Sequence, residues 1–445
     1  MSELKVISRH AATVLVGQLA VMAYGVTDTI VAGRYAEASL AALSVGSAVY
    51  ISVFVTLMGM LQALMPVWAR LRGGKQHLQL GRSFRQALYL CAATMVIGIG
   101  LLLSPGPVLR LTEVPVALQG EVEHYLAVLA IALPPSLLFR MFSTLNQSLG
   151  RPQLVTWLQI ASLFVKVPLS IWFAFGGLGL EPQGLVGCAW ATLLVNYAML
   201  GVALWLLRTQ DLYQPYAIWH ALERPDWKAI AAFARLGIPG GLAIMVEVTS
   251  FTLMALFIAR MGTVAAASHQ IAANITTVLY MVPLSISIAA SSRASYWLGS
   301  GDARKARAAI RNGFQMTVSA ALLMSAALVL LQTSIANIYA RSPDVVAMTV
   351  PLLGWVALYH LADAVQVICV FLLRCFGVTI APLLVYCFLL WGVGLAGGYV
   401  LAYHGLPGWS AMSTPNAFWA TSAAALGLTA LIFTLILSRA SRQTR

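Results

Sequence analysis

The chain has 445 residues, of which 60% are hydrophobic and 9% are charged. Soluble domains carry about 25% charged residues, so the composition excludes a soluble globular protein and indicates a polytopic membrane protein. The formal net charge of +13 does not indicate binding to nucleic acid, because the basic residues gather in alternate connections between apolar segments.

Twelve apolar segments are long enough to cross a membrane, since a spanning helix needs about 20 mostly apolar residues. The predicted spans are 10–33, 45–69, 83–104, 124–146, 153–176, 184–208, 231–259, 270–297, 311–335, 347–373, 380–403 and 414–438. The first is too long for a cleavable signal peptide and has no small-residue cleavage site. We therefore expect an all-α polytopic membrane protein.

The basic residues are distributed asymmetrically between the two sides. Of the 27 Lys and Arg residues, 21 fall in the tails and the even-numbered connections. This pattern is the positive-inside rule, and it predicts that both termini are cytoplasmic. The same residues would contact anionic membrane lipid. The odd-numbered connections hold Arg34, Arg110, Arg260 and Arg341.

A polar segment near the middle of the chain divides it into two halves. We expect an N-lobe of six helices over 1–208, a cytoplasmic linker over 209–230 and a C-lobe of six helices over 231–445. The triplet Trp-Ala-Thr recurs at 190–192 and 419–421, in the last helix of each half. The sequence thus predicts two pseudo-symmetric six-helix bundles, an arrangement that is common in transporters.

Three acids lie inside predicted spans: Asp28, Glu247 and Asp363. A carboxylate at the centre of a spanning helix costs roughly 2.5–3.5 kcal/mol on insertion scales and is a functional-site hypothesis by default. A titratable acid there would bind H⁺ or help to ligate Na⁺. The alternative for each acid is a structural role, in a buried pair or near the interface.

Polar neighbours accompany two of these acids. His360 and Gln366 lie three residues either side of Asp363, so the three residues share a helix face. This face should point to a cavity rather than to lipid. Glu247 follows a Gly-Ile-Pro-Gly-Gly sequence at 237–241, which allows a bent helix start of the kind seen at transporter sites.

Lys166 is a basic residue inside the fifth predicted span. Its long stem would let it reach the interface, or it could pair with Asp28 inside the membrane. Gln270 and Asn274 share one face of the eighth span and either line a cavity or join helices.

Motifs for enzymes and metal sites are missing from the sequence. It contains no HExxH, GxSxG or P-loop pattern, so we expect no catalytic residues. Gly299-Ser300-Gly301-Asp302 matches the GxGD of intramembrane proteases, but it lies in a basic loop. The cysteines match no disulfide or metal spacing and are interpreted as core residues. They are Cys91, Cys188, Cys369, Cys375 and Cys387.

Several stretches resemble the multidrug and toxic compound extrusion family, in its bacterial NorM-like branch. The string Asp28-Thr29-Ile30-Val31-Ala32-Gly33 is similar to the Asp-Thr-x-x-x-Gly pattern of its first helix. The other similar stretches are LMPVWARLRGG (64–74), LGIPGGLAIMVEVTSF (236–251), HQIAAN (269–274), MVPLS (281–285) and LADAVQV (361–367). Together they lie in register along nearly the whole chain.

This resemblance implies two six-helix bundles around a V-shaped central cavity, in a monomer of the bacterial inner membrane. It implies antiport of organic cations, drugs or toxic metabolites against H⁺ or Na⁺, with no other cofactor. Asp28 would be the acid of the N-lobe. Glu247 and Asp363 would be the acids of the C-lobe, and the one metal ion that they would bind is Na⁺. The predicted cavity residues are Lys166, Ser170, Gln270, Asn274, His360 and Gln366.

The sequence departs from the family pattern in the fifth helix. Where this branch often carries Asn-x-Pro-x-Asn, the chain has Lys166-Val167-Pro168-Leu169-Ser170. An ammonium there would occupy the place of a coupling cation and keep Asp28 ionised. We therefore expect coupling to depend mainly on Glu247 and Asp363.

Two other functions remain open from the sequence. One is a flippase for lipid or lipid-linked oligosaccharide on a related fold, which the buried bases Lys166 and Arg140 favour and the three acids oppose. The other is a sensor or scaffold that does not transport. The sequence does not distinguish H⁺ from Na⁺ as the coupling ion.

Overall fold

The computed structural model describes residues 3–111, 115–177, 179–405 and 410–442. Apart from one isolated bridge between Gly177 and Leu180, the described residues contain no strands. Within them, twelve helical segments are long and apolar enough to cross a membrane. The predicted number of spans is therefore confirmed, and the helices extend several residues beyond most predicted boundaries.

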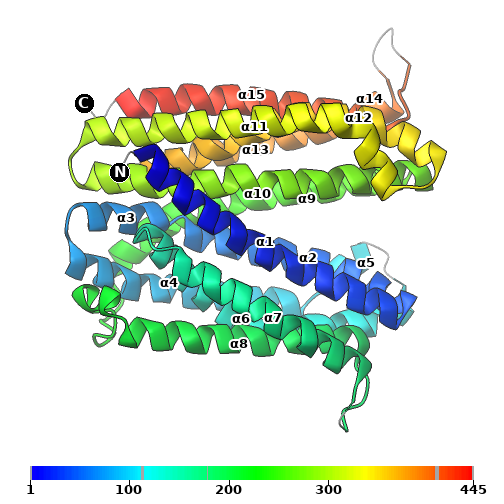
Figure 1. The fold of residues 1–445 in the computed structure, drawn as a ribbon. Coiled ribbons are helices and arrows are strands. Elements are labelled where there is room, and N and C mark those ends of the chain that lie inside the picture. The colour runs from blue at the N-terminus through cyan, green and yellow to red at the C-terminus, as the bar shows by residue number, and fades with distance from the viewer. Residues whose placement is uncertain (1–2, 112–114, 178, 406–409, 443–445) are drawn as a thin grey trace. The chain divides into compact units, whose positions relative to one another are not determined.

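The chain forms two compact units, and Figure 1 shows the helices of each in chain order. The N-terminal unit comprises residues 13–241 and the C-terminal unit comprises 1–12 with 242–445. The helices up to residue 216 are α1 (Glu3–Tyr35), α2 (Glu37–Gln62), α3 (Met65–Gly73), α4 (His77–Leu103), α5 (Gly106–Leu111), α6 (Val116–Ser148), α7 (Gln153–Phe175), α8 (Gly184–Thr209) and the 3-10 helix η1 (Asp211–Tyr216).

The remaining helices complete the C-terminal unit. They are α9 (Trp227–Ala259), α10 (Thr263–Gly299), α11 (Ala303–Tyr339), α12 (Pro343–Cys375), α13 (Ile380–Tyr386), the π-helical stretch η2 (Cys387–Ala396), α14 (Gly397–Tyr403) and α15 (Pro415–Arg442). The first turns of α1 belong to this unit because Glu3 makes a bidentate ion pair with Arg293 of α10, at 2.6 and 3.0 Å.

Two of the predicted spans are interrupted helices. In the second span, the helix breaks at residues 63–64, before Pro66, and continues as α3. The eleventh span is built from α13, η2 and α14 in succession. A π-helical stretch is usually short and is often found at functional sites. This one follows directly on Tyr386, which belongs to the polar cluster described below.

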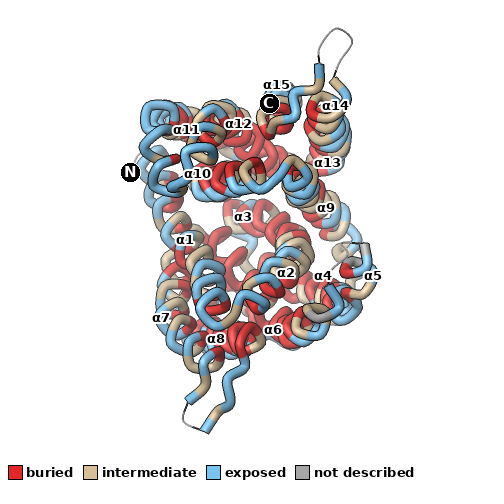
Figure 2. Tube along the Cα trace, turned by 90° about the vertical axis from the view of Figure 1, so that its right-hand side faces the viewer, coloured by how far each residue is buried: buried red, intermediate tan, exposed pale blue. Residues whose placement is uncertain are grey.

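Each unit is organised around one central helix. In the N-terminal unit, α6 packs against α2, α4 and α8, and α7 packs against α8. In the C-terminal unit, α12 packs against α10, α11 and α15, and η2 packs against α15. The central helix is the fourth span of its half in both units, and Figure 2 shows buried residues along it. The repeated packing pattern is the structural form of the predicted pseudo-symmetry.

Candidate functional site

The first polar cluster joins α1 to α7 and α8 inside the N-terminal unit. Lys166 Nζ lies 2.7 Å from Asp28 Oδ1 and donates a second hydrogen bond, of 2.9 Å, to the carbonyl oxygen of Cys188. Ser170 Oγ donates to the same carboxylate oxygen at 3.3 Å. Lys166 is fully buried and Asp28 is 9% exposed. Lys166 is thus paired inside the unit and does not reach the interface.

This cluster is one step in a seam of polar contacts between α1 and α7. One turn before Asp28, the hydroxyl of Tyr24 is hydrogen-bonded to that of Ser162. Near the start of the seam, Thr156 Oγ1 donates to the carbonyl oxygen of Thr13 at 2.8 Å. The seam follows from spacing, because Ser162, Lys166 and Ser170 recur every four residues on α7. In a hydrocarbon environment such hydrogen bonds hold helices together.

Arg140, which the sequence analysis also named as a buried base of this half, lies apart from Asp28 on the central helix. It is 9% exposed and follows Ser136 by one turn of α6. Ser136 Oγ accepts a hydrogen bond of 2.7 Å from Asn196 Nδ2 of α8. In addition to the Asp28 cluster, the N-terminal unit therefore has a polar contact between its central helix α6 and α8.

The second polar cluster lies in the C-terminal unit and begins at Asp363 on α12. Asp363 is 1% exposed, and its Oδ1 accepts a hydrogen bond of 2.8 Å from Gln366 Nε2. The hydroxyl of Tyr386 donates to Gln366 Oε1 from α13. The amide of Gln366 is therefore held from both ends, which fixes the hydrogen-bond donor that faces the carboxylate.

A second acid and a base complete this C-terminal cluster. Glu247 of α9 is half-buried and lies close enough to Asp363 and Arg374 for the three charges to interact. Arg374 is 4% exposed, and its guanidinium carbon lies 4.8 Å from the ring centre of Phe371. The phenol of Tyr280 from α10 lies near the same charges. The cluster thus contains two acids and one base, and Arg374 Nε and Nη1 have no hydrogen-bond partner among the described residues.

The other predicted cavity residues have different surroundings. His360 is fully buried on α12, and neither of its ring nitrogens has a hydrogen-bond partner among the described residues. Gln270 and Asn274 are exposed on α10, where Gln270 Nε2 donates to Asn274 Oδ1 at 3.3 Å. The structure therefore brings Gln366 to Asp363, and leaves Gln270 and Asn274 bonded to each other.

Sequence reasoning missed three members of the C-terminal cluster. Arg374 falls one residue beyond the tenth predicted span, but it lies in the last turn of α12 and is buried. Its spacing of 11 residues from Asp363, about three turns, puts the two residues on one helix face but about 16 Å apart along the axis. Tyr280 and Tyr386 carried no such signal, since an isolated tyrosine in a membrane helix is ordinary.

Twelve helices that are long and apolar enough to cross a membrane, with charged clusters buried inside the units, define the class as a polytopic membrane protein. The MatE family model matches residues 14–172 and 239–400, which is well over half of the chain. The chain belongs to the MatE family.

Relatives and solved structures agree with this assignment. The chain is 36% identical over 424 residues to the probable multidrug resistance protein NorM of Aromatoleum aromaticum, covering 95% of this chain and 91% of that protein. It is 30% identical to the multidrug resistance protein PmpM of Pseudomonas aeruginosa, covering 99% and 92%. The fold is similar to that of the Vibrio cholerae MATE transporter VcmN in the bent form, with a TM-score of 0.86, 16% identity and coverage of 100% and 98%.

Proposed function

We propose that this transporter is a secondary antiporter that exports small organic cations in exchange for H⁺ or Na⁺. The names of the similar proteins, which are multidrug resistance proteins, support the substrate class. The chain carries no nucleotide-binding motif, so the energy would come from an ion gradient. The two units would give the cavity access to each side in turn.

The observation that carries this proposal is the charge of the C-terminal cluster. The charge of Glu247 interacts with those of Asp363 and Arg374, so this group of two acids and one base has one negative charge in excess when both acids are ionised. A buried negative charge is expensive unless it is paired. Uptake of a proton would remove the excess negative charge, and so would binding of Na⁺ with further oxygen ligands. We therefore propose Glu247 and Asp363 as the ion-coupling acids.

The N-terminal cluster has no such excess. The carboxylate of Asp28 already faces the ammonium of Lys166 at 2.7 Å and a hydroxyl from Ser170. An incoming cation would have to displace a fully buried lysine. We propose that this pair has a structural role and does not take part in coupling.

Coupling requires that ion and substrate favour different states of the transporter. A ligand shifts a conformational equilibrium only by the difference between its affinities for the two states. Neutralisation of the C-terminal cluster by the ion would favour release of a cationic substrate, and loss of the ion would favour its uptake. His360, Gln270 and Asn274 are proposed as residues that line the substrate path.

We further propose a monomer in the bacterial inner membrane with both termini in the cytoplasm. The bacterial relatives and the twelve spans support the membrane. The concentration of 21 of the 27 basic residues in the tails and even-numbered connections supports the orientation.

The test is efflux of ethidium from proteoliposomes under an imposed pH gradient or an imposed Na⁺ gradient. We expect one gradient to drive efflux and Asp363→Asn to abolish it. The asparagine keeps the oxygen that accepts from Gln366, so this variant should fold. Asp344→Asn, which changes an exposed acid in the first turn of the same helix, is the matched control and should transport normally.

Other outcomes would contradict the proposal. Efflux that persists in Asp363→Asn would remove this acid from the coupling site. Failure of the folded wild type to move ethidium under either gradient would overturn the drug-export function. Translocation of a fluorescent phospholipid by the same liposomes would then support the flippase.

A further inference from the structure

The segment between α8 and α9, here called the linker strap (residues 210–226), is folded onto the ends of α4 and α6. Arg85 of α4 makes two hydrogen bonds to the carboxylate of Glu223, at 2.5 and 3.0 Å, and one of 2.5 Å to the carbonyl oxygen of Ala217. Tyr213 donates to Asn146 Oδ1 of α6 at 2.8 Å. The linker strap is therefore a docked element of the N-terminal unit.

Other contacts fix the far end of the linker strap. The side chain of Gln86 donates to the carbonyl oxygen of Arg224 at 3.0 Å and accepts from the amide of Asp226 at 2.8 Å. Gly81 allows the backbone of Tyr216 to approach α4, because a Cβ at position 81 would collide with the Tyr216 carbonyl oxygen. These contacts hold the segment in place on both sides of residues 218–222.

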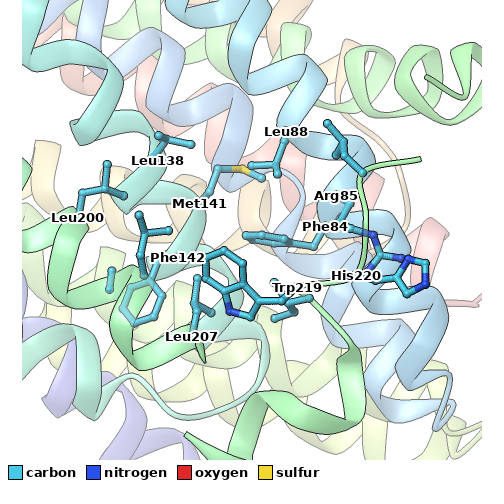
Figure 3. Close-up of a pocket in the computed structure, with 14 residues that line it drawn as sticks. Phe84, Arg85, Leu88, Leu138, Met141, Phe142, Leu200, Leu207, Trp219 and His220 are labelled. Carbon is cyan, nitrogen blue, oxygen red and sulfur yellow. The ribbon is translucent and has the colours of Figure 1, made fainter. Parts of the chain in front are cut away.

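A cavity of about 280 Å³ lies under the linker strap, between α4 and α8 and above α6 (Figure 3). All of its lining belongs to the N-terminal unit. Its floor is formed by fully buried residues of α6, among them Met141 and Phe142. The indole of Trp219 and the ring of Phe84 lie over this floor in Figure 3. The cavity is therefore a preformed apolar space.

The chemistry of the lining selects an apolar occupant. Most lining side chains are Leu, Phe, Met, Ile or Ala. The charged member is Arg85, whose hydrogen bonds go to Glu223 and the Ala217 carbonyl. No acid lines the cavity. An organic cation would meet a guanidinium and find no carboxylate to pair with, so the lining disfavours the proposed transport substrates.

The mouth of the cavity opens where the chain is exposed and apolar. Leu204, Trp219 and Leu222 line it and are 42%, 54% and 55% exposed. Exposed apolar residues on a spanning helix face lipid, because water is absent there. Trp205 beside the mouth is 62% exposed, and exposed indoles are typical of the level of the lipid headgroups. The mouth is thus placed at the boundary between headgroups and acyl chains.

The surroundings of the mouth are basic. Arg208 is exposed and follows the lining residue Leu207 directly, and Arg224 is exposed two residues after Leu222. Arg82 is exposed on α4, one turn before the cavity, and pairs with the Asp226 carboxylate at 3.7 Å. Arg208 and Arg224 therefore carry the positive charge of the rim. Basic side chains at the membrane surface attract anionic lipid headgroups. The mouth therefore combines an apolar entrance with a positive rim.

We propose that this cavity is a binding site for one acyl chain of an anionic phospholipid, whose headgroup contacts Arg208 and Arg224. The cavity volume supports part of a chain rather than a whole drug, because it falls below the range of about 300–1,000 Å³ of small-molecule pockets. The bound chain would support the docked linker strap from below. With the proposed orientation, this lipid would belong to the cytoplasmic leaflet, and this is the one part of the proposal that rests on the proposed function.

The experiment measures phospholipid retained by the purified full-length protein. Native mass spectrometry after detergent exchange would count phosphatidylglycerol and phosphatidylcholine on each variant. Ala203→Leu adds bulk inside the cavity and should lower retention. Gly201→Leu adds bulk to the same helix at an exposed position with no atom near the new Cβ, and should behave like the wild type.

The headgroup contact has its own variants. Arg208→Gln and Arg224→Gln should each lower the preference for phosphatidylglycerol about fivefold, because a basic residue near an anionic surface contributes about that factor. Arg304→Gln, at an exposed position in the C-terminal unit, is the control. A photoactivatable acyl chain on phosphatidylglycerol should label residues 200–207 and 218–222.

Four results would overturn the proposal. One is equal retention by Ala203→Leu and the wild type. The second is equal retention of the two lipids by the wild type, and the third is labelling confined to other segments. Displacement of phosphatidylglycerol by ethidium would make the cavity a substrate site and would also contradict the proposal. None of these readouts uses transport, so they are independent of the efflux test.

Discussion

Lys166 determines whether the N-terminal unit can take part in ion coupling. A buried ammonium needs a counter-charge, and Asp28 supplies it together with the carbonyl oxygen of Cys188. Removing one partner of a buried ion pair leaves an uncompensated charge, whereas removing both partners can be nearly neutral. The pair is therefore expected to behave as a unit in mutation experiments.

We predict that Lys166→Met and Asp28→Asn each destabilise the protein by about 3–5 kcal/mol. The double variant should recover most of this loss and should still export ethidium. Thermal and SDS-induced unfolding of the purified protein would measure the double-mutant cycle. Ser170→Ala removes a hydroxyl donor only and should cost about 1 kcal/mol. Additive losses in the double variant would show that the two charges are not coupled.

Gln366 illustrates a different use of a polar residue. Its amide is held by Tyr386 on one side and by Asp363 on the other. The Asp363 carboxyl group therefore keeps the Gln366 amide as its neighbour in either charge state. Glu247 and Arg374 supply the other charges of the cluster. Precise placement of a coupling acid needs such a supporting partner.

At the level of elements, the linker strap shows that a polar connection can be part of a folded unit. Its docking depends on Arg85, which is buried in α4 and bonded to Glu223. The hydrogen bonds from Arg85 hold the pKa of the Glu223 carboxyl below its usual range. A carboxyl group whose pKa is lowered in the folded state stabilises that state above its unfolded pKa, and the contribution is lost as the pH falls through the folded pKa.

We predict that Glu223→Gln lowers stability at pH 7 by about 1–2 kcal/mol, because Arg85 loses a charged acceptor. The difference from the wild type should persist down to about pH 5, shrink below about pH 4.3 and vanish once the wild-type carboxyl is protonated. Melting temperatures across this range would measure it. Glu123→Gln changes an exposed acid in the same unit and serves as the control. A difference that does not vary with pH would exclude the ion pair as its source.

The interrupted helices are a second feature at the level of elements. In the C-terminal unit, the π-helical stretch η2 begins one residue after Tyr386 and packs against α15. Glycines at 392, 394, 397 and 398 lie in or beside it. A π-helical stretch is often found at functional sites, and this one lies next to the C-terminal cluster.

At the level of the whole molecule, the two units repeat one packing scheme with different contents. Each has its fourth span at the centre, but one buries a closed ion pair and the other holds two acids with one base. Pseudo-symmetry of the backbone therefore does not impose symmetry of function. We infer a division of labour in which the C-terminal unit carries the coupling.

The proposed orientation has a direct test with reporter fusions. Green fluorescent protein fused after Arg445 should fluoresce in intact cells, because this reporter folds in the cytoplasm. Alkaline phosphatase fused after Glu181, in the connection between α7 and α8, should be active because that connection is expected outside. If alkaline phosphatase fused after Arg445 were active instead, the orientation would be the reverse of the proposed one. The basic rim of the cavity would then lie in the outer leaflet.

The amino-acid sequence by itself determined the membrane class, the number of spans, the repeat and the three acids inside spans. These properties depend on hydrophobicity and charge, which act residue by residue and can be read along the chain. The tertiary structure decided which polar residues meet. It placed Lys166 against Asp28, buried Arg374 beside Glu247 and folded the linker strap over an apolar cavity. Such contacts depend on how helices distant in sequence pack, and the period of a single helix does not contain that information.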